Sequence, residues 1–360
     1  MTAVPAKVSE LERVLVIAPN WIGDAVMSTP MLANLRRGLP KATIDLLVLP
    51  RVAPLFEEYP HVNRVLTWSA TATWRDQLAH IRTLRRVKYE LALLLPNSFR
   101  SAVQAWMIGA HTRVGYATDG RRWFLTHPIP PGYVQPLRRS SAHAHQDVIH
   151  QVDAYLGLIE ALEIPVLERV PLLVPSPGAE AAADLLWTSQ GLRTGEGVVG
   201  ICPGAASGPA KRWWPERFAA LADRLMTETG VRVVLFGNAN EMALAAQIRA
   251  RMTQHAVSFT GLDTLSSFMA LAARCRVLVT NDAGSMHVAA AVGTPVVAIF
   301  GPTDPRRTAP MTQSATVLRR DLPCSPCFRA VCPYTDHPCM RLIEVEEVYA
   351  AVDHMLGFRP

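Results

Sequence analysis

Three segments of the sequence bring charged, polar and small residues directly after short apolar runs that are typical of β-strands. The first is 19-PNWIGDAVMSTP-30, in which Asp24 follows Gly23 at the expected start of a helix. An aspartate at this place either caps the helix or acts as a general base, and partial desolvation by Trp21 and Ile22 would suit the second role. Both interpretations stay open at this point.

The second segment, 203-PGAASGPAKRWWP-215, follows the apolar run 197–201. Its small residues allow backbone N–H groups to approach an anion, and Lys211 adds a positive charge. It matches neither the P-loop pattern nor the dinucleotide-binding G-x-G-x-x-G pattern. We therefore predict a phosphate site outside both motifs, and the alternative is a flexible loop that exposes Lys211 and Arg212.

The third segment, 280-TNDAGSMHVAAAVGTP-295, places Asp282 at the end of an apolar run and a small-residue helix after it. The N–H groups of Ala283 and Gly284 at the helix start are predicted to bind phosphate. A carboxylate would repel phosphate, so Asp282 is predicted to accept hydrogen bonds from hydroxyl groups. His287, one turn further, could reach the same ligand, although a single histidine is more often a core or surface residue.

Four of the six cysteines are close together in the sequence, at Cys324, Cys327, Cys332 and Cys339. Their spacing, C-x2-C-x4-C-x6-C, is compatible with a tetrahedral structural zinc site. An iron–sulfur cluster, unligated thiols and disulfides formed in air are the alternatives. A metal here would stabilise the chain before the last helix and would take no part in catalysis.

The elements that must position these residues alternate between strands and helices. Strands are predicted at 13–18, 43–48, 64–67, 91–95, 112–116, 197–201, 231–237, 276–280 and 295–301, and helices in the second half at 215–225, 264–274 and 283–292. This alternation predicts an α/β fold with two parallel sheets in tandem. Since α/β sheets bind ligands at the carboxyl ends of their strands, the three segments are expected to face a cleft between the sheets.

The stretch 171-PLLVPSPG-178 interrupts the alternation and predicts a linker. We expect a first domain at 1–172 and a second at 173–342. The phosphate-binding segments place a nucleotide diphosphate donor in the second domain, which leaves the first domain to bind the acceptor molecule. A last helix within 343–360 could pack on either domain, including back on the first.

Composition and charge restrict the partners. The chain has 49% apolar and 18% charged residues, a formal net charge of +6 and a pI near 9.2. Its partners are therefore expected to be anionic: nucleic acid, phosphorylated metabolites or an acidic membrane surface. Nucleic acid is the weakest of these, because the sequence has no aromatic RNA platform, helix-turn-helix signature or clustered basic stripe. No signal peptide or apolar run of membrane-spanning length is recognisable, so a cytoplasmic protein is expected.

Together the segments resemble the bacterial ADP-heptose:lipopolysaccharide heptosyltransferases. The resemblance rests on N-W-I-G-D at 20–24, P-A-K-R-W at 209–213, T-N-D-A-G-S-M-H at 280–287 and F-G-P-T-D-P at 300–305. P-N-S-F-R at 96–100 is most similar to the heptosyltransferase II branch. The resemblance extends over nearly the whole chain, and the combination of motifs is more specific than any one of them.

The resemblance implies a GT-B architecture, with two facing Rossmann-like domains, and inverting, metal-independent transfer of L-glycero-D-manno-heptose from ADP-heptose. The acceptor implied is the first heptose of the lipopolysaccharide inner core on lipid A. By this resemblance Asp24 is the catalytic base, Lys211 contacts phosphate and sugar, and Asp282 holds the heptose. Glu241, in 236-FGNANE-241, is expected to bind the ribose, and its alternative is a solvated residue that opens a helix.

The acceptor is expected to contact the first domain through Asn97, Ser98 and Arg100, with Arg113, Arg121 and Arg122 as further candidates. The segment 121–140, which includes Arg138 and Arg139, could lie against lipid headgroups. The implied protein is a monomer without a catalytic cofactor, cytoplasmic and peripheral at the cytoplasmic face of the inner membrane.

Two other functions remain open. One is a heptosyltransferase that acts at another core position or uses a different nucleotide sugar, because regiochemistry depends on ångström-level placement. The other is a non-catalytic protein that binds a nucleotide sugar or lipopolysaccharide, with Asp24 serving only as a helix cap.

Overall fold

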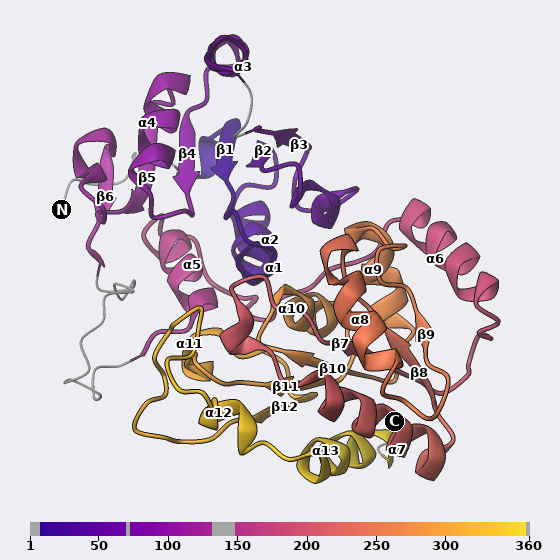
Figure 1. Cartoon of the computed structure of the whole chain (residues 1–360). Coiled ribbons are helices and arrows are strands. Elements are labelled where there is room, and N and C mark those ends of the chain that lie inside the picture. The colour runs from indigo at the N-terminus through magenta and orange to yellow at the C-terminus, as the bar shows by residue number, and fades with distance from the viewer. Residues whose placement is uncertain (1–7, 70–72, 132–147, 358–360) are drawn as a thin grey trace. The chain divides into compact units, whose positions relative to one another are not determined.

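The structure, a computed structural model, describes residues 8–69, 73–131 and 148–357. It divides into two compact units, Met1–Pro171 and Leu172–Pro360, and each has a six-stranded sheet. The sheets can be followed by colour in Figure 1, the first from indigo to magenta and the second from red to yellow. Neighbouring strands are parallel throughout both sheets, so the expected α/β class with two Rossmann-like units in tandem is confirmed.

The first sheet has the order β3-β2-β1-β4-β5-β6. Its strands are β1 (Arg13–Ile17), β2 (Thr43–Val48), β3 (Arg64–Thr67), β4 (Leu91–Leu94), β5 (Thr112–Tyr116) and β6 (His127–Ile129). The central strands β1 and β4 are buried along almost their whole length, because helices cover both faces of the sheet. This explains why they appear in the sequence as continuous apolar runs.

The helices of the first unit are α1 (Ile22–Met27), α2 (Thr29–Gly38), α3 (Trp74–Val87), α4 (Phe99–Ile108) and α5 (Gln151–Glu160). Leu15 and Ile17 pack with α3 and α4 in one buried cluster. Side chains alternate along a strand, so Val14 and Val16, which are also fully buried, point to the opposite face. The remaining helices α1, α2 and α5 contact one another and supply the second layer.

The second sheet has the order β12-β11-β10-β7-β8-β9. Its strands are β7 (Val198–Cys202), β8 (Arg232–Leu235), β9 (Val257–Ser258), β10 (Val277–Asn281), β11 (Val296–Ile299) and β12 (Ala315–Leu318). The strand order repeats that of the first sheet, with one group of three strands on each side of the centre. The prediction of a second α/β sheet after the proline-rich stretch is therefore confirmed.

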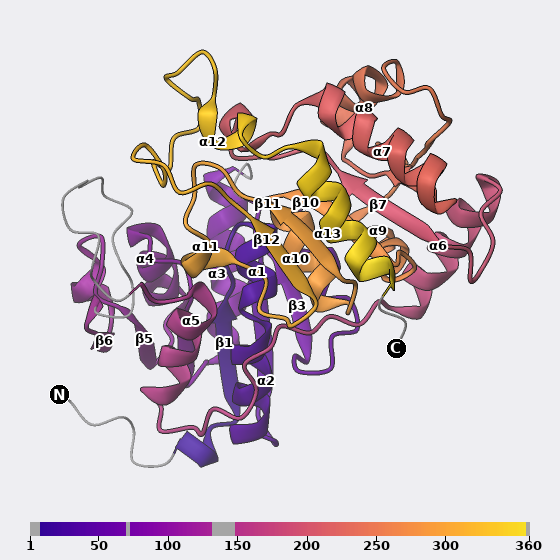
Figure 2. The same cartoon turned by 90° about the horizontal axis from the view of Figure 1, so that it is seen from below.

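Helices cover both faces of this sheet as well. They are α6 (Pro177–Ser189), α7 (Pro215–Thr229), α8 (Met242–Arg249), α9 (Leu265–Ala273), α10 (Gly284–Ala291), α11 (Pro305–Thr308), α12 (Pro338–Arg341) and α13 (Val345–Gly357). On one face α7, α8 and α13 pack in a single buried cluster with β7, β10 and β11. Of the two placements left open for the last helix, the structure has the one on the second unit, where α13 contacts α7, β10 and β11 (Figure 2).

The proline-rich stretch is only partly a linker. Helix α6 already begins at Pro177, because Ser176 accepts a hydrogen bond from the backbone N–H of Ala179 and proline suits the first helical position. Before it, Leu173 is buried and its N–H donates to the carbonyl of Ala291. The expectation of a linker through Gly178 is therefore wrong at its C-terminal end.

Within the described residues, the helices are all too short or too polar to cross a membrane.

Candidate active site

In the second sheet the strand order reverses between β7 and β10: successive strands are added to one side of β7 and then, from β10 on, to the other side. These strands are neighbours, with Thr280 of β10 beside Cys202 of β7, although β8 and β9 lie between them in the chain. A crevice forms at the carboxyl ends of the strands at such a point, and α/β proteins bind ligands there. The segments that carry Lys211 and Asp282 follow these two strands, so the structure brings together two of the predicted segments.

The two charged groups at this point are in direct contact. Lys211 Nζ lies 2.5 Å from Asp282 Oδ2, and the hydroxyl of Thr303 donates to the same oxygen at 2.6 Å. The Asp282 side chain is only 6% exposed, and that of Lys211 is 18% exposed. The buried carboxylate is thus held by a cation and a hydroxyl from two further loops.

Neighbouring residues fix the backbone of the Lys211 segment. Asn281, fully buried at the end of β10, donates to the carbonyl of Pro203 at 2.7 Å and accepts from the N–H of Trp213 at 3.0 Å. The indole of Trp213 is also buried and donates to the carbonyl of Ile343. The predicted alternative, a flexible loop, does not describe Lys211, because its segment is tied to the sheet on both sides.

The start of α10 has the expected form of a helix N-terminus next to Asp282. Ala283 occupies the N-cap in an extended conformation, no side chain caps the helix, and Gly284 is its first residue. Both residues are partly exposed. The N–H groups at the start of a helix have no partner within the helix and can bind an anion. His287, one turn further along α10, is buried to the same extent as Asp282, with 6% of its surface exposed, and its contact with the donor stays a prediction.

Glu241 lies at the start of a helix, as one of its two interpretations expects, and its contact with the ribose stays a prediction. Its carboxylate accepts from the N–H of Asn238 at 2.9 Å, which closes a capping box at the turn after β8. The same carboxylate lies so close to Gly204 that a Cβ at that position would come within 1.7 Å of Oε1. The glycine after β7 therefore allows Glu241 to reach the ligand-binding edge of the sheet.

Asp263 is a residue of this edge that the sequence analysis missed. It lies in the turn after β9, and burial, with a smaller contribution from the charge of Glu241, raises its pKa to about 7. Perturbed carboxylates in such positions often mark ligand sites. A signal was present, because 259-FTGLDT-264 brings an acidic residue into the turn after a strand, but β9 has only two residues and was not recognised.

In the first unit the strand order reverses between β1 and β4, where Ile17 lies beside Leu94. Helix α1 follows β1 and begins at Ile22, so Asp24 is its third residue and Trp21 is the N-cap. The interpretation of Asp24 as the capping residue is therefore wrong. An acidic residue in the first turn is still favoured by the helix dipole.

Tyr155 of α5 contacts the carboxylate of Asp24. Its hydroxyl lies 3.5 Å from Asp24 Oδ1, although the two residues are 131 positions apart. Burial, followed by the charge of Asp24, raises the pKa of Tyr155 well above its usual range, so the hydroxyl stays protonated. Tyr155 is therefore positioned to donate to the ionised form of the carboxylate.

The loop after β4 carries Asn97 and Ser98 at the same edge as Asp24. Ser98 is the N-cap of α4 and accepts from the N–H of Ser101 at 3.3 Å. Asn97 Oδ1 accepts from the guanidinium of Arg121 at 3.0 Å. Arg121 is fully buried and also donates to the carbonyl of Tyr116, and burial lowers its pKa to about 10. The expectation that Arg121 contacts an acceptor is wrong, because it shapes the loop from below the surface.

The remaining arginines separate into different places. Arg100 and Arg122 are exposed. Arg113 is near the N-terminal end of β5, the opposite edge from Asn97, and its guanidinium donates to the carbonyls of Ala110 and Phe124 at 2.6 and 2.7 Å. The expectation that Arg113 binds the acceptor is therefore wrong.

The predicted headgroup contacts Arg138 and Arg139 lie outside the described residues.

Comparison with known proteins decides the family. Residues 77–337 match Glycosyltransferase family 9 (heptosyltransferase), a range of more than half the chain. The chain belongs to glycosyltransferase family 9. The resemblance recognised from the motifs is thereby confirmed, and the chain is a glycosyltransferase by class.

Several family 9 relatives match over most of their length. Lipooligosaccharide heptosyltransferase 2 of Haemophilus ducreyi is 32% identical over 321 residues, which cover 85% of this chain and 88% of that relative. Lipopolysaccharide heptosyltransferase 2 of Escherichia coli K12 gives the same identity and coverage. The solved structure of E. coli ADP-heptose LPS heptosyltransferase II matches with a TM-score of 0.76 and 29% identity, covering 96% of this chain and 98% of that chain. The expected GT-B fold class is confirmed by this likeness.

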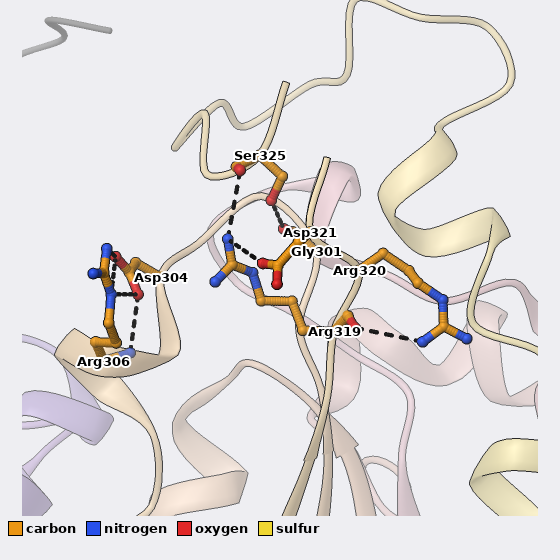
Figure 3. A network of polar contacts seen from close by, with 7 residues as sticks. All are labelled: Gly301, Asp304, Arg306, Arg319, Arg320, Asp321 and Ser325. Atoms are coloured by element: carbon orange, nitrogen blue, oxygen red, sulfur yellow. Dashed lines mark hydrogen bonds and ion pairs between the residues drawn. The ribbon is translucent and has the colours of Figure 1, made fainter. Parts of the chain in front are cut away.

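The cysteine-rich segment of this family 9 chain is fixed to the turn after β11 at its start. The hydroxyl of Ser325 donates to the carbonyl of Gly301 at 2.7 Å, and Arg319 reaches both the carbonyl of Ser325 and the carboxylate of Asp321 (Figure 3). The N–H of Cys327 donates to the carbonyl of Pro302 at 2.9 Å. The segment is thus ordered by backbone contacts.

Further along, the same segment contacts the Lys211 loop. The N–H of Ala210 donates to the carbonyl of Ala330 at 3.0 Å, and His337 Nε2 lies 2.8 Å from the carbonyl of Ala210. Gly208 packs closely against the cysteine-rich segment, because a Cβ at this position would come within 2.5 Å of the Ala330 carbonyl oxygen. The cysteine-rich segment therefore supports the backbone next to Lys211.

The four cysteines lie near one another, since burial, followed by the charges of Cys332, Cys324 and Cys327, raises the pKa of the Cys339 thiol to about 11, but they do not form a recognisable metal site. Among the described residues, which include all four, no group of three or more His, Cys, Asp and Glu side chains could hold a metal ion. Cys339 is buried in the core of the second unit, whereas Cys324, Cys327 and Cys332 are half-buried in irregular chain. The six cysteines, all in the described part of the chain, are free thiols.

Proposed function

We propose that the chain is heptosyltransferase II, an inverting enzyme that transfers L-glycero-D-manno-heptose from ADP-heptose to the first heptose of the lipopolysaccharide inner core. The relatives named heptosyltransferase 2, at 32% identity over 85% of the chain, carry this proposal. It is supported by charged residues at the point in each sheet where the strand order reverses, because α/β folds bind ligands at such points.

The second unit is proposed to bind ADP-heptose. Lys211 and the N–H groups of Ala283 and Gly284 would contact the diphosphate, because they are the cationic and amide donors at this edge. Asp282 would accept hydrogen bonds from hydroxyls of the heptose, and Glu241 from both hydroxyls of the ribose.

The ion pair of Lys211 and Asp282 prepares both groups for these roles. Asp282 keeps its contact with Thr303 when Lys211 turns toward phosphate, so the carboxylate is not left without a donor. The departing ADP carries increasing negative charge in the transition state. Lys211 and the amides of α10 would stabilise that charge without a catalytic cofactor or metal.

The first unit is proposed to supply the base and the acceptor contacts. Asp24 removes the proton from the attacking hydroxyl, whose oxygen forms the new bond to the anomeric carbon as the bond to the ADP oxygen breaks. This requires the carboxylate within about 3 Å of that hydroxyl. Tyr155 would orient Asp24, and Asn97, Ser98 and Arg100 would contact the acceptor core.

The protein is proposed to work as a monomer in the cytoplasm. Because the proposed acceptor is attached to lipid A, the protein would be in transient contact with the inner membrane. The proposal is tested by incubation with ADP-heptose and inner-core acceptors that end in one or two heptoses, followed by linkage analysis of the product. Transfer to the first heptose is expected. Transfer only to another core position identifies a different heptosyltransferase, and tight binding of ADP-heptose without transfer identifies the non-catalytic alternative.

A further inference from the structure

Large aromatic side chains are exposed together on the first unit. Trp123 is 90% exposed, Trp106 55% and Phe99 46%, and all three come from α4 or from the short 3₁₀ helix η3 (Arg121–Phe124). The ring of Phe124 lies 5.3 Å from that of Phe99 and 5.7 Å from that of Trp106. We call these four residues the α4–η3 surface.

The α4–η3 surface is held rigidly. Arg113 donates to the carbonyl of Phe124 and to that of Ala110, which joins η3 to the turn after α4. Phe99 is fixed at the start of α4, where its N–H donates to Asp119 at 3.1 Å. Aromatic side chains that a fold holds in an exposed position are typical of an interaction surface.

The charge around this surface is mainly positive, and the exposed Asp119 beside Phe99 is an acidic exception. Neither α4 nor η3 contains an acidic residue, and both expose an arginine, Arg100 and Arg122. The adjoining C-terminal part of α3 exposes Arg82, Arg85 and Arg86, followed by Lys88, without an acidic residue among them. Arg85 reaches the end of α4, since its Nε lies 3.5 Å from where a Cβ of Gly109 would be.

We infer that the α4–η3 surface, with the basic end of α3, docks on an anionic phospholipid bilayer. Tryptophan rings are stable at the depth of lipid headgroups, where one side is apolar and the other wet. Arginine side chains beside them would contact lipid phosphates, and each basic group near an anionic surface strengthens binding.

The position of the surface agrees with a lipid-anchored acceptor, and to this extent the inference rests on the proposed function. Phe99 and Arg100 directly follow Asn97 and Ser98, the residues proposed to contact the acceptor. A bilayer at the α4–η3 surface would therefore lie next to the loop that receives a substrate projecting from that bilayer. A protein partner would not need the combination of exposed indoles and a surface rich in arginine.

Co-sedimentation of the full chain with lipopolysaccharide-free vesicles tests this inference. Binding is expected with an equimolar mixture of phosphatidylcholine and phosphatidylglycerol, weaker binding with phosphatidylcholine alone, and loss of binding as salt is raised. The variant Trp106→Ala/Trp123→Ala and the variant Arg85→Glu/Arg86→Glu should each bind the anionic vesicles at least about tenfold more weakly. These side chains are exposed, so the variants should fold, and circular dichroism is used to check the folding of each variant.

Trp74→Ala is the matched control. Trp74 is 67% exposed on α3 but lies eleven residues before Arg85, about 16 Å along the helix axis. It should bind vesicles as the wild type does. Equal binding of the wild type to both vesicle types would overturn the inference. Unchanged binding by the two double variants would do the same.

Transfer to a soluble core oligosaccharide, measured on the same preparations, separates the two proposals. The double variants should keep wild-type transfer, because the soluble acceptor needs no membrane. If they lose it while Trp74→Ala keeps it, the surface belongs to the acceptor site and the membrane assignment is wrong. If the wild type transfers no heptose yet binds anionic vesicles, the proposed function fails and the docking surface stands.

Discussion

Lys211 and Asp282, 71 positions apart in the chain, form an ion pair with 2.5 Å between Nζ and Oδ2. The pair lies where the strand order of the second sheet reverses, between β7 and β10. Thr303 donates to the same carboxylate oxygen, so three loops meet at one point. A diphosphate that binds at this edge has to compete with Asp282 for the ammonium group. The pair therefore couples the cation that would hold phosphate to the carboxylate that would hold sugar.

Substitution of the cation should reduce turnover strongly. Lys211→Met removes the charge that would stabilise departing ADP, and kcat/KM for ADP-heptose should fall at least about 100-fold. Arg212→Met is the matched control, because Arg212 is the neighbouring exposed cation, and it should stay near the wild-type value. Similar losses in the two variants would show that general positive charge, not Lys211, is what the donor requires.

The pH dependence of turnover should depend on Tyr155. Its hydroxyl is expected to stabilise the ionised form of Asp24, so in Tyr155→Phe the acidic limb of the kcat/KM profile should move to higher pH. Tyr116→Phe is the control: it also removes a buried hydroxyl, one that donates to α5 at Ala154, without touching Asp24. The role of Tyr155 is excluded if both variants keep the wild-type profile, or if both lose stability without moving the acidic limb.

Glu241 can be tested separately from its capping role. Glu241→Gln keeps an acceptor for the N–H of Asn238 but loses the charge that would accept both ribose hydroxyls, so the KM for ADP-heptose should rise about tenfold. Asn238→Ala breaks the other half of the capping box and should lower stability by about 1 kcal/mol with little change in KM. If Glu241→Gln lowers stability but leaves the KM for ADP-heptose unchanged, Glu241 has a capping role only.

Asp263 should make the protein less stable as pH rises. Its pKa of about 7 in the folded protein lies above the ordinary value of 3.8, so between these values the folded state binds the extra proton. Stability is thus highest below pH 4 for this group and falls up to pH 7, by no more than about 1.4 kcal/mol per pH unit. Thermal unfolding should find Asp263→Asn more stable than the wild type at pH 8, with a flatter profile between pH 5 and 8.

The matched control for Asp263→Asn is Asp353→Asn, which removes an exposed carboxylate on α13 and should leave the profile unchanged. A wild-type profile that is flat from pH 5 to 8, or one that Asp263→Asn does not alter, contradicts the raised pKa of the half-buried Asp263 carboxyl.

The centre of each sheet could be predicted from the sequence, because strands covered on both faces appear as continuous apolar runs. Edge strand β3 was also predicted, at 64–67, but the other three edge strands were not. β6 contains Pro128, β9 has two residues, and β12 is only half-buried. A short or half-exposed strand carries too little apolar signal to be distinguished from a loop.

The candidate site was predictable where a functional side chain directly follows a central strand, as Asp282 and Asn97 do. It was not predictable where a contact depends on the rotation of another element. The sequence shows Arg121 and Arg122 as an equivalent pair, yet one is fully buried under the Asn97 loop and the other is exposed. The contact of Tyr155 with Asp24 depends on how α5 packs on α1, which local sequence does not encode.

The single-turnover rate of Asp24→Asn, measured with saturating ADP-heptose and an inner-core acceptor, tests the central claim that Asp24 is the catalytic base. The amide keeps the size of the side chain but cannot accept the proton, so the rate should fall at least about 100-fold with melting temperature and ADP-heptose affinity near wild type. A rate within a few-fold of wild type in the folded variant would contradict the account.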